Sequence, residues 1–316
     1  MSVSSSLYDK QLVTDLISKV KGKSSLTALG QQVPVAFTGN KEFTFTMDKD
    51  IDIVAENGAT SHGGITMNPV TIVPVKFEYG ARISDEFMYA SDEQKVDYLT
   101  AFNDGFAKKL AVGLDLAAMH GINPRTKVIS SLVSTHSFDQ LVSNTVVYLG
   151  NSSKADENIE TAIALVEGGD GDVTGIAISP TVRAALASYT KSTGEKLYPD
   201  FAFGGQPASL GGQRLSINKT VSQTVKATAE AEAAAIDHGI VGDFANMFKW
   251  GYGKDITLEI IEYGDPDNSG SDLKGHNQIY LRGEAYLGWA IFNAASFARI
   301  VVSGSNANGS VLPTGG

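Results

Sequence analysis

The sequence predicts an α+β fold in which one long helix and several long strands dominate. A single apolar stripe at helical spacing runs through residues 92–120. Apolar and polar residues alternate in residues 41–47, 70–83 and 278–290, which is the pattern of half-buried strands. The chain has 316 residues, so we expect either one large domain or two interleaved domains.

The N-terminal part is predicted to combine a short helix with an extended arm. Apolar residues recur at helical spacing in residues 6–20 and indicate an amphipathic helix. Residues 21–25 end this helix, and the stretch that follows as far as Pro34 has no clear period. We therefore expect an extended arm ahead of the first strand.

Two strands next to the arm are predicted to form a long hairpin. Residues 41–47 place three apolar side chains on one face: Phe43, Phe45 and Met47. The second strand spans residues 70–83, and Pro74 within it cannot donate to a sheet ladder, so we expect a sheet edge or a bulge there. Residues 57–64, rich in Gly, Asn, Ser and Thr, form the tip. Since isolated hairpins are marginal in water, this hairpin needs a surface to lie against.

The helix predicted at residues 92–120 has clear signals at both ends. Ser91 and Gln94 have the spacing of a capping box, and Gly121 follows the last turn. Its apolar stripe consists of Leu99, Phe102, Phe106, Leu110 and Leu114. Gly105 and Gly113 are unfavourable inside a helix, so we expect them to permit a close packing contact or a bend.

Residues 125–245 are predicted to form a separate α/β region. The expected elements are a helix at 156–166, a buried strand at 175–179, a helix at 180–189, a Gly-rich loop at 203–212 and a strand at 214–217. The Ala- and Glu-rich run at 227–235 is open to two interpretations, a helix or an exposed excursion.

The C-terminal part predicts a second hairpin. Residues 255–262 and 278–290 are its strands, the polar segment 264–272 is its loop, and the pattern extends through Phe297, Ile300 and Val301. Arg282 and Glu284 face the same side of their strand. We expect them either to pair with each other or to reach a neighbouring chain. The loop is predicted to be a solvated turn, or a cation site if it lies at a symmetry axis.

The composition excludes several classes of function. The chain has no cysteine, which removes disulfides, thiolate nucleophiles and zinc–thiolate sites. Its net charge of −10 argues against a nucleic-acid-binding surface, which needs clustered Lys and Arg. It contains neither a secretory signal nor an apolar run long enough to span a membrane, so we expect synthesis in the cytosol.

The sequence offers no catalytic constellation. Its histidines show no metal-ligand spacing: His62, His120, His136, His238 and His276. His120 at a helix C-terminus is interpreted as a favourable partner of the helix dipole. Because nucleophile motifs and phosphate-binding loops are also missing, we predict no catalytic, cofactor-binding or metal-binding residues and no enzymatic activity.

Four motifs in order along the chain together resemble the major capsid proteins of tailed bacteriophages, which have the Hong Kong 97-type fold. They are the return strand and short helix within Val73–Phe87, the turn Gln206–Leu215, the triplet Gly242-Asp243-Phe244 and the strand Leu281–Trp289. The resemblance extends over residues 70–300.

The resemblance implies an α+β phage capsid fold with an N-terminal arm, an extended hairpin loop, a long spine helix, an axial α/β domain and a peripheral domain with a long β-hairpin. The implied parts are the arm (1–39), the hairpin loop (40–82), the peripheral domain with the spine helix (83–124 and 246–303), the axial domain (125–245) and a flexible tail (304–316).

The resemblance also implies a structural protein that self-assembles into an icosahedral phage head around the packaged DNA genome. Its expected partners are further copies of itself in hexamers and pentamers, a separate scaffolding protein and a portal, without sequence-specific nucleic-acid binding, membrane contact or cofactors. It is expected in the virion capsid, and in the host cytoplasm during assembly. The predicted intersubunit contacts are Phe43, Phe45, Val73, Phe77, Arg282 and Glu284.

Two alternatives stay open at this point. An encapsulin-type shell, which encloses cargo enzymes, shares the same fold. A soluble hydrolase would use histidine and carboxylates within residues 125–245, and a pocket that gathers two histidines with an Asp or Glu would favour it.

Overall fold

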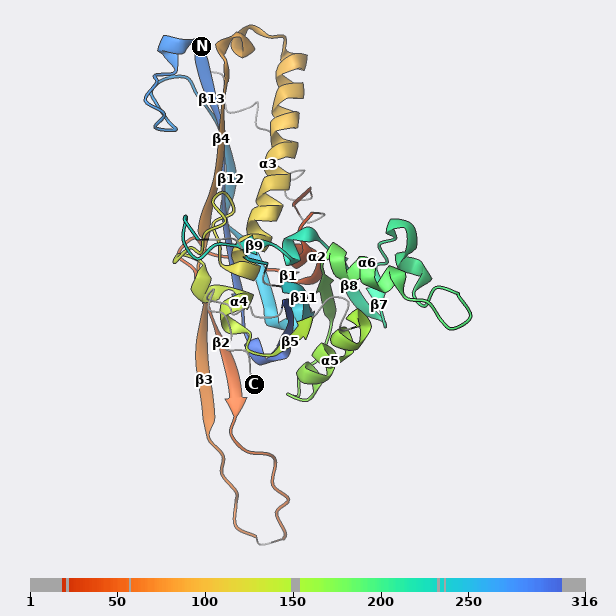
Figure 1. Cartoon of the computed structure of the whole chain (residues 1–316). Coiled ribbons are helices and arrows are strands. Elements are labelled where there is room, and N and C mark those ends of the chain that lie inside the picture. Colours follow the sequence, from red (N-terminus) through yellow and green to blue (C-terminus); the bar gives the residue numbers. More distant parts are fainter. Residues whose placement is uncertain are drawn as a thin grey trace.

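Two sheets and one long helix form the body of the molecule, and a two-stranded hairpin projects from it (Figure 1). The computed structural model describes residues 19–20, 23–56, 58–148, 154–231, 234–235 and 237–302. Of the helix predicted at 6–20, only the last two residues are described, and they are helical. The predicted tail at 304–316 lies outside the described residues.

The first sheet has four strands in the order β1-β12-β13-β4. Its strands are β1 (Gln31–Gln32), β12 (Phe248–Ile261), β13 (Gln278–Ile291) and β4 (Val75–Ser84). β12 and β13 pair antiparallel over 14 residues each, which confirms the predicted C-terminal hairpin and lengthens it. β4 adds antiparallel to β13 and forms an edge of the sheet.

The second sheet has six strands in the order β5-β14-β11-β6-β8-β7. They are β5 (Thr145–Tyr148), β14 (Phe297–Val302), β11 (Asp237–Gly242), β6 (Gly175–Ile178), β8 (Gln213–Ile217) and β7 (Ser209–Leu210). The helices α5 (Ala155–Glu167) and α6 (Pro180–Ser188) pack against it and share one apolar cluster with it. Both helices agree with the sequence prediction, including Pro180 in the first turn.

β14 does not continue the C-terminal hairpin as the sequence pattern suggested. It pairs with β11 and β5, so this segment of the predicted peripheral part belongs to the sheet of the predicted axial part. The short 3₁₀ helix η8 (Ala294–Ser296) turns the chain between β13 and β14. Alternation within a strand cannot reveal this change, because it does not specify which sheet the strand joins.

The hairpin near the N-terminus is built from β2 (Asn40–Met47) and β3 (Ile65–Ile72), which pair antiparallel. The single strand predicted at 70–83 is wrong: it is divided into β3 and β4 around Val73 and Pro74. Proline has no N–H for a ladder and restricts the residue before it. The chain therefore leaves one sheet here and enters another, and the connection at the hairpin tip is longer than predicted.

The long helix α3 (Asp92–His120) has the predicted bounds. Ser91 and Gln94 form the complete capping box, and Gly121 ends the helix in the left-handed conformation with a φ of 65°. A Cβ on Gly113 would lie 3.3 Å from the Phe77 ring, so this glycine permits the predicted close contact with β4. A Cβ on Gly105 would meet no atom of the described residues within 4 Å beyond its own helix, so these residues give no packing reason for this glycine.

The remaining elements are short. The helices are α2 (Ser25–Leu29), α4 (Phe138–Leu141), α7 (Phe244–Met247), η2 (Asp85–Tyr89), η3 (Ser134–His136), η5 (Pro199–Gly204), η6 (Lys219–Val221) and η7 (Lys274–His276), and the strands are β9 (Thr224–Val225) and β10 (Ala234–Ala235). Residues 227–230 of the run 227–235 are exposed and not helical, and Ala234–Ala235 form β10 paired with β9. No helix in the described part of the chain is both long and apolar enough to cross a membrane.

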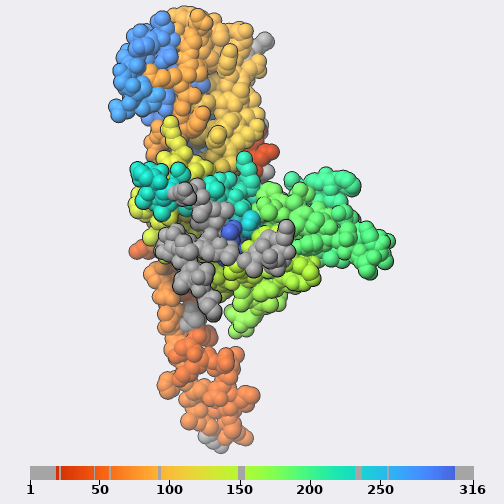
Figure 2. Space-filling model, in the orientation of Figure 1, coloured from red at the N-terminus to blue at the C-terminus, as the bar shows by residue number. Residues whose placement is uncertain are grey.

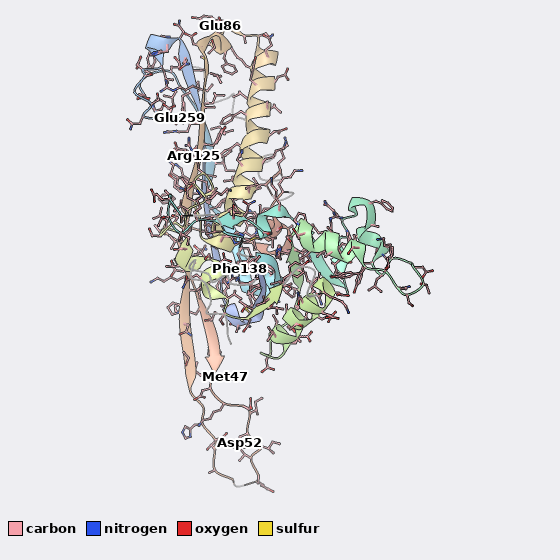
Figure 3. The ribbon with its side chains drawn as sticks, in the orientation of Figure 1. Met47, Asp52, Glu86, Arg125, Phe138 and Glu259 are labelled. Atoms are coloured by element: carbon pink, nitrogen blue, oxygen red, sulfur yellow. The ribbon has the colours of Figure 1, made fainter. Side chains whose placement is uncertain are left out.

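An aromatic cluster joins the two sheets. The Phe138 ring, labelled in Figure 3, lies 5.9 Å from Phe244, 5.6 Å from Phe248 and 5.0 Å from Phe297, measured between ring centroids. All four rings are fully buried. Because they come from α4, α7, β12 and β14, they fix both sheets to one core.

Asp115 of α3 anchors the arm from inside the protein. Its buried carboxylate accepts hydrogen bonds from the backbone N–H groups of Ser25 and Leu26, at 2.9 and 3.2 Å. It also accepts from the hydroxyls of Ser24 and Thr220. Burial raises the pKa of Asp115, and these four hydrogen bonds oppose that rise. The carboxylate thus connects α3 to the N-terminus of α2 and to η6.

We expect Asp115→Asn to lower the free energy of unfolding by about 2–4 kcal/mol, because an amide turns an N–H₂ donor toward groups that are themselves donors. Urea denaturation of the unassembled protein measures this change. Asp97→Asn, on an exposed position of the same helix, is the control and is expected to change stability by less than about 0.5 kcal/mol. Equal effects of the two substitutions would contradict the anchoring role of Asp115.

Candidate assembly surface

One face of the β2–β3 hairpin is apolar and uncovered. Residues opposite each other on paired strands share a face, and the pairs here are Phe43 with Pro69, Phe45 with Met67 and Met47 with Ile65. These six residues define the hairpin face. The exposed fractions are 60% for Phe43, 56% for Phe45 and 66% for Met47. The hairpin extends away from the body, with Met47 near the far end of its strands (Figure 3).

The other face of the hairpin is mainly polar. Thr44, Thr66 and Asn68 alternate with the apolar residues along the same two strands, and the Thr44 hydroxyl donates to the Asn68 carbonyl. The hairpin is therefore amphipathic, although it lies beyond the body of its own chain (Figure 2). Such a large exposed apolar surface is typical of a protein–protein contact.

The base of the hairpin is fixed to the body. Ile72, the last residue of β3, is fully buried in a cluster with Val35 and Ala290. Lys249 of β12 forms an ion pair with Glu42, with 2.6 Å between Nζ and Oε2. These contacts hold the root of the hairpin while its outer part stays exposed.

The loop at the end of the hairpin also presents apolar side chains. Ile51 and Ile53 are 97% and 96% exposed, and they alternate with Asp50 and Asp52. Isolated exposed apolar residues are normal on proteins, but these two lie in the loop that follows β2, next to the hairpin face. Asp52 lies at the far end of the molecule (Figure 3).

The other predicted contact residues lie in different surroundings. Val73 is 53% exposed, between the hairpin and the body. Phe77 packs against α3 of its own chain and is only partly exposed. Arg282 and Glu284 lie on the face of the first sheet that points away from α3, because the intervening Gly283 faces Phe106 of that helix.

Arg282 and Glu284 take part in a row of ion pairs within the chain. Arg282 Nη2 lies 2.6 Å from Glu259, and its Nε lies 3.4 Å from Glu284. Glu284 in turn lies 2.6 Å from Lys76 Nζ, and this hydrogen bond lowers the pKa of Glu284. The first of the two expected arrangements, pairing with each other, is therefore present. Contact with another chain stays a prediction.

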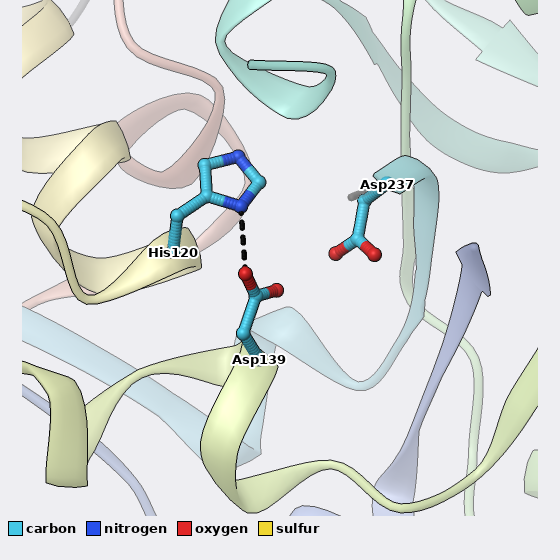
Figure 4. Close-up of side chains that lie close together, drawn as sticks. All are labelled: His120, Asp139 and Asp237. Atoms are coloured by element: carbon cyan, nitrogen blue, oxygen red, sulfur yellow. Dashed lines mark hydrogen bonds and ion pairs between the residues drawn. The ribbon is translucent and has the colours of Figure 1, made fainter. Parts of the chain in front are cut away.

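A buried ionic cluster lies at the C-terminal end of α3 (Figure 4). His120 Nδ1 lies 3.0 Å from Asp139 Oδ2, and its Nε2 lies 2.9 Å from the carbonyl oxygen of Thr220. Arg299 of β14 donates two hydrogen bonds to Asp237, at 3.1 and 2.9 Å, and lies 3.1 Å from Asp139 Oδ1. We call His120, Asp139, Asp237 and Arg299 the buried ionic cluster.

The buried ionic cluster has the residue types of a metal site, but its geometry is that of an ion-pair network. His120, Asp139 and Asp237 offer ligand atoms within 4.8 Å of one another. However, Arg299 engages both oxygens of Asp237, and both ring nitrogens of His120 are already hydrogen-bonded. Two cations therefore balance two carboxylates. Sequence analysis missed this network because its members are far apart in the chain.

The charges of the buried ionic cluster shift the pKa values of its members. Burial lowers the pKa of His120, but the adjacent Asp139 carboxylate outweighs burial and raises this pKa to about 9. Burial and the charge of Asp139 raise the pKa of Asp237 to about 7. Burial would raise the pKa of Asp139 as well, but His120 and Arg299 hold it below its usual value.

The buried ionic cluster lacks the second histidine that the hydrolase alternative expects. Among the described residues, this cluster is the one group of three or more His, Cys, Asp or Glu residues able to share a ligand, and it contains a single, fully buried histidine. A groove of about 370 Å³ lies beside the start of α3, where Phe87, Tyr89 and Tyr98 line it without any histidine.

Comparison with known proteins identifies the fold. The phage capsid family model matches residues 6–302 of the chain. The chain belongs to the phage capsid family. A chain of Mycobacterium phage Ogopogo superposes with a TM-score of 0.75 and 28% identity, covering 89% of this chain and 92% of that chain. A comparison with curated proteins returns no match.

Two further structures agree with this fold. A chain of Gordonia phage Cozz has a TM-score of 0.71 and 23% identity over 90% of this chain and 87% of its own. The capsid of an empty GTA particle has a TM-score of 0.61 and 16% identity, covering 89% of this chain and 90% of that chain. The protein is a structural major capsid protein of a phage-type shell, and these matches favour that interpretation over encapsulin.

We expect the free energy of unfolding of the unassembled capsid protein to fall as pH rises from about 6.5 to about 9. His120 has a pKa of about 9 when folded and 6.5 as an unperturbed side chain. Its contribution is therefore complete below pH 6.5, and it is lost as pH rises through 9. The difference amounts to about 3 kcal/mol at most. Asp237 acts in the same direction at lower pH, because its raised pKa favours the folded state only while it holds a proton.

Urea denaturation at a series of pH values tests this expectation. In His120→Gln, stability is expected to be lower at pH 6.5 and to vary less between pH 6.5 and 9 than in the unsubstituted protein. His276→Gln, which changes an exposed histidine, is the control and should keep the original pH profile. A His120→Gln profile parallel to that of the unsubstituted protein would refute the assignment.

Proposed function

We propose that the capsid protein self-assembles into an icosahedral phage head, with hexamers and pentamers of the same chain enclosing packaged DNA, and that each hairpin face lies on a neighbouring copy. The observation that carries this proposal is the uncovered apolar face of the β2–β3 hairpin, whose strands place six apolar residues on one side. A second copy is the natural cover for this face, because the family builds its shells from many copies of one chain.

The free energy gained by burying the hairpin face is modest, which suits assembly through many contacts of similar size. Full burial of a large apolar side chain contributes about 1.5–3 kcal/mol, so covering the exposed half of each one contributes about 1 kcal/mol. Phe43, Phe45, Met47, Ile65 and Met67 together then supply several kcal/mol for each copy. This amount offsets part of the loss of translational and rotational freedom, and further interfaces supply the rest.

The rigid base of the hairpin supports the same role. Because Ile72 is buried and Lys249 pairs with Glu42, the direction in which the hairpin leaves the body is set before assembly. A preorganised contact loses less conformational freedom on binding. Val73 extends the exposed apolar strip toward the body, and Phe77 offers its uncovered edge. Arg282 and Glu284 present a charged face that a neighbour would meet.

The parts of the chain take roles in this proposal. The β2–β3 hairpin, residues 40–72, is the extended loop; β4, the rest of residues 83–124 and the β12–β13 hairpin form the peripheral domain, which therefore begins earlier than predicted; and residues 125–245 together with β14 form the axial domain. We propose that the protein has no enzymatic activity and that a separate scaffolding protein and a portal join it in the host cytoplasm during assembly. The family resemblance alone supports these partners.

We expect the double substitution Phe43→Ser and Phe45→Ser to prevent or strongly weaken shell assembly while the protein stays folded. Both rings are more than half exposed, so their loss removes little core packing. The loss of about 1 kcal/mol at each contact corresponds to roughly a five- to tenfold weaker association per residue. Sedimentation velocity and negative-stain electron microscopy measure the assembled fraction.

The matched control is Thr66→Ala on the polar face of the same hairpin, which is expected to leave assembly unchanged. Circular dichroism confirms that both variants are folded. Normal shells from the double variant, or no shells from the unsubstituted protein at any concentration with its scaffold present, would overturn the proposed function.

A further inference from the structure

Two neighbouring segments of this acidic protein carry positive charge only. Residues 121–130 contain Arg125 and Lys127, and residues 218–228 contain Lys219 and Lys226. Neither segment contains an Asp or Glu, although the chain has 35 of these residues and a net charge of −10. The average charge therefore conceals a local excess of cations.

Hydrogen bonds join the two segments to each other. The backbone N–H of Lys226 donates to the Lys127 carbonyl at 2.9 Å, and the N–H of Ile129 donates to the Lys226 carbonyl at 3.0 Å. In Figure 2 the yellow surface of the first segment and the teal surface of the second lie side by side near the middle of the molecule. The cations of both segments thus share one region.

An apolar layer fixes this region on α3. Ile122, Ile129 and Val225 pack against Leu116 and Val112 of the helix. Residues 109, 112 and 116 are spaced three and four apart and so lie on one helix face. Exposed Lys109 therefore stands at the edge of the same packing surface.

Lys219 lies beside α3, because the next residue, Thr220, is hydrogen-bonded to that helix. Thr220 accepts a hydrogen bond through its carbonyl from His120 and donates its hydroxyl to Asp115, at 2.9 and 2.7 Å, and both partners belong to α3. Lys109 and Lys219 both act on Lys127: burial, followed by their two positive charges, lowers the pKa of Lys127. We call Lys109, Lys127, Lys219 and Lys226 the lysine platform.

The lysine platform brings together lysines for which the described residues supply no carboxylate partner, whereas four other lysines are paired. Lys76, Lys154, Lys191 and Lys249 each form an ion pair with a glutamate. Within the part of the chain that the structure describes, the ion pairs include none for the four platform lysines. Adjacent like charges without counter-charges repel one another, and a polyanion relieves this repulsion.

We propose that the lysine platform binds the phosphate backbone of nucleic acid without reading its sequence. Lysine ammonium groups act as compact point charges toward phosphate, whereas base recognition needs side chains with a defined donor and acceptor pattern. The proposal rests on the proposed function in one respect, that the shell encloses DNA. The acidic remainder of the protein repels DNA, so the contact stays confined to this region.

Fluorescence anisotropy with a labelled 30-base-pair duplex of random sequence tests this binding. The unassembled capsid protein is titrated at several NaCl concentrations, and log K is plotted against log salt concentration. Each phosphate contact contributes about 0.9 to the slope. The double variant Lys127→Gln with Lys219→Gln is therefore expected to reduce the slope by about 2 and to weaken binding at low salt.

The charge-matched control is Lys196→Gln with Lys274→Gln, two exposed lysines outside the platform, and it should leave the slope unchanged. Lys109→Gln alters only a helix surface and should reduce the slope by about 1, so a folding defect in the double variant leaves the proposal testable. Equal slopes for the platform and control variants would overturn the proposal. Tighter binding of polyglutamate than of DNA would also overturn it and would indicate an acidic protein partner.

Electron microscopy of the platform variants separates this inference from the proposed function. Normal shells together with unchanged DNA binding would refute the lysine platform alone. If the unsubstituted protein forms no shells, the proposed function fails, whatever the result of the titration.

Discussion

The C-terminal half of α3 is the part on which the rest of the structure depends. Its buried Asp115 holds the arm and η6, and its buried His120 holds α4 through Asp139. Polar groups this deep are stable only when they are fully partnered. The helix therefore joins segments from the beginning, the middle and the end of the chain through directional contacts as well as apolar packing.

The contacts that stabilise the folded subunit involve other residues than the surface proposed for assembly. The aromatic cluster around Phe138 and the buried ionic cluster lie inside the chain and need no second copy. The hairpin face contributes little to that core, because its side chains are largely exposed. A shell protein benefits from this separation, since it folds first and covers its apolar surface afterwards.

The charged side chains also differ in whether they are paired within the chain. Inside the protein, Arg299 and His120 are paired with two carboxylates, and on the surface of the first sheet Arg282 and Lys76 are paired with Glu259 and Glu284. The two segments that carry Lys127, Lys219 and Lys226 of the lysine platform contain no acidic residue. The cations of the platform are therefore available to an external polyanion, which the average composition did not predict.

The sequence by itself determined the local features: the ends of α3 follow from Ser91, Gln94 and Gly121, and the alternation from residue 41 to residue 47 made the hairpin amphipathic. Only the tertiary structure decided which strands pair, as the break at Pro74 and the transfer of β14 to the second sheet show. It also brought Arg299 to His120 and Asp139. Caps and periodicity depend on residues a few positions apart, whereas sheet partners and buried ion pairs depend on contacts between distant segments, which a local pattern does not encode.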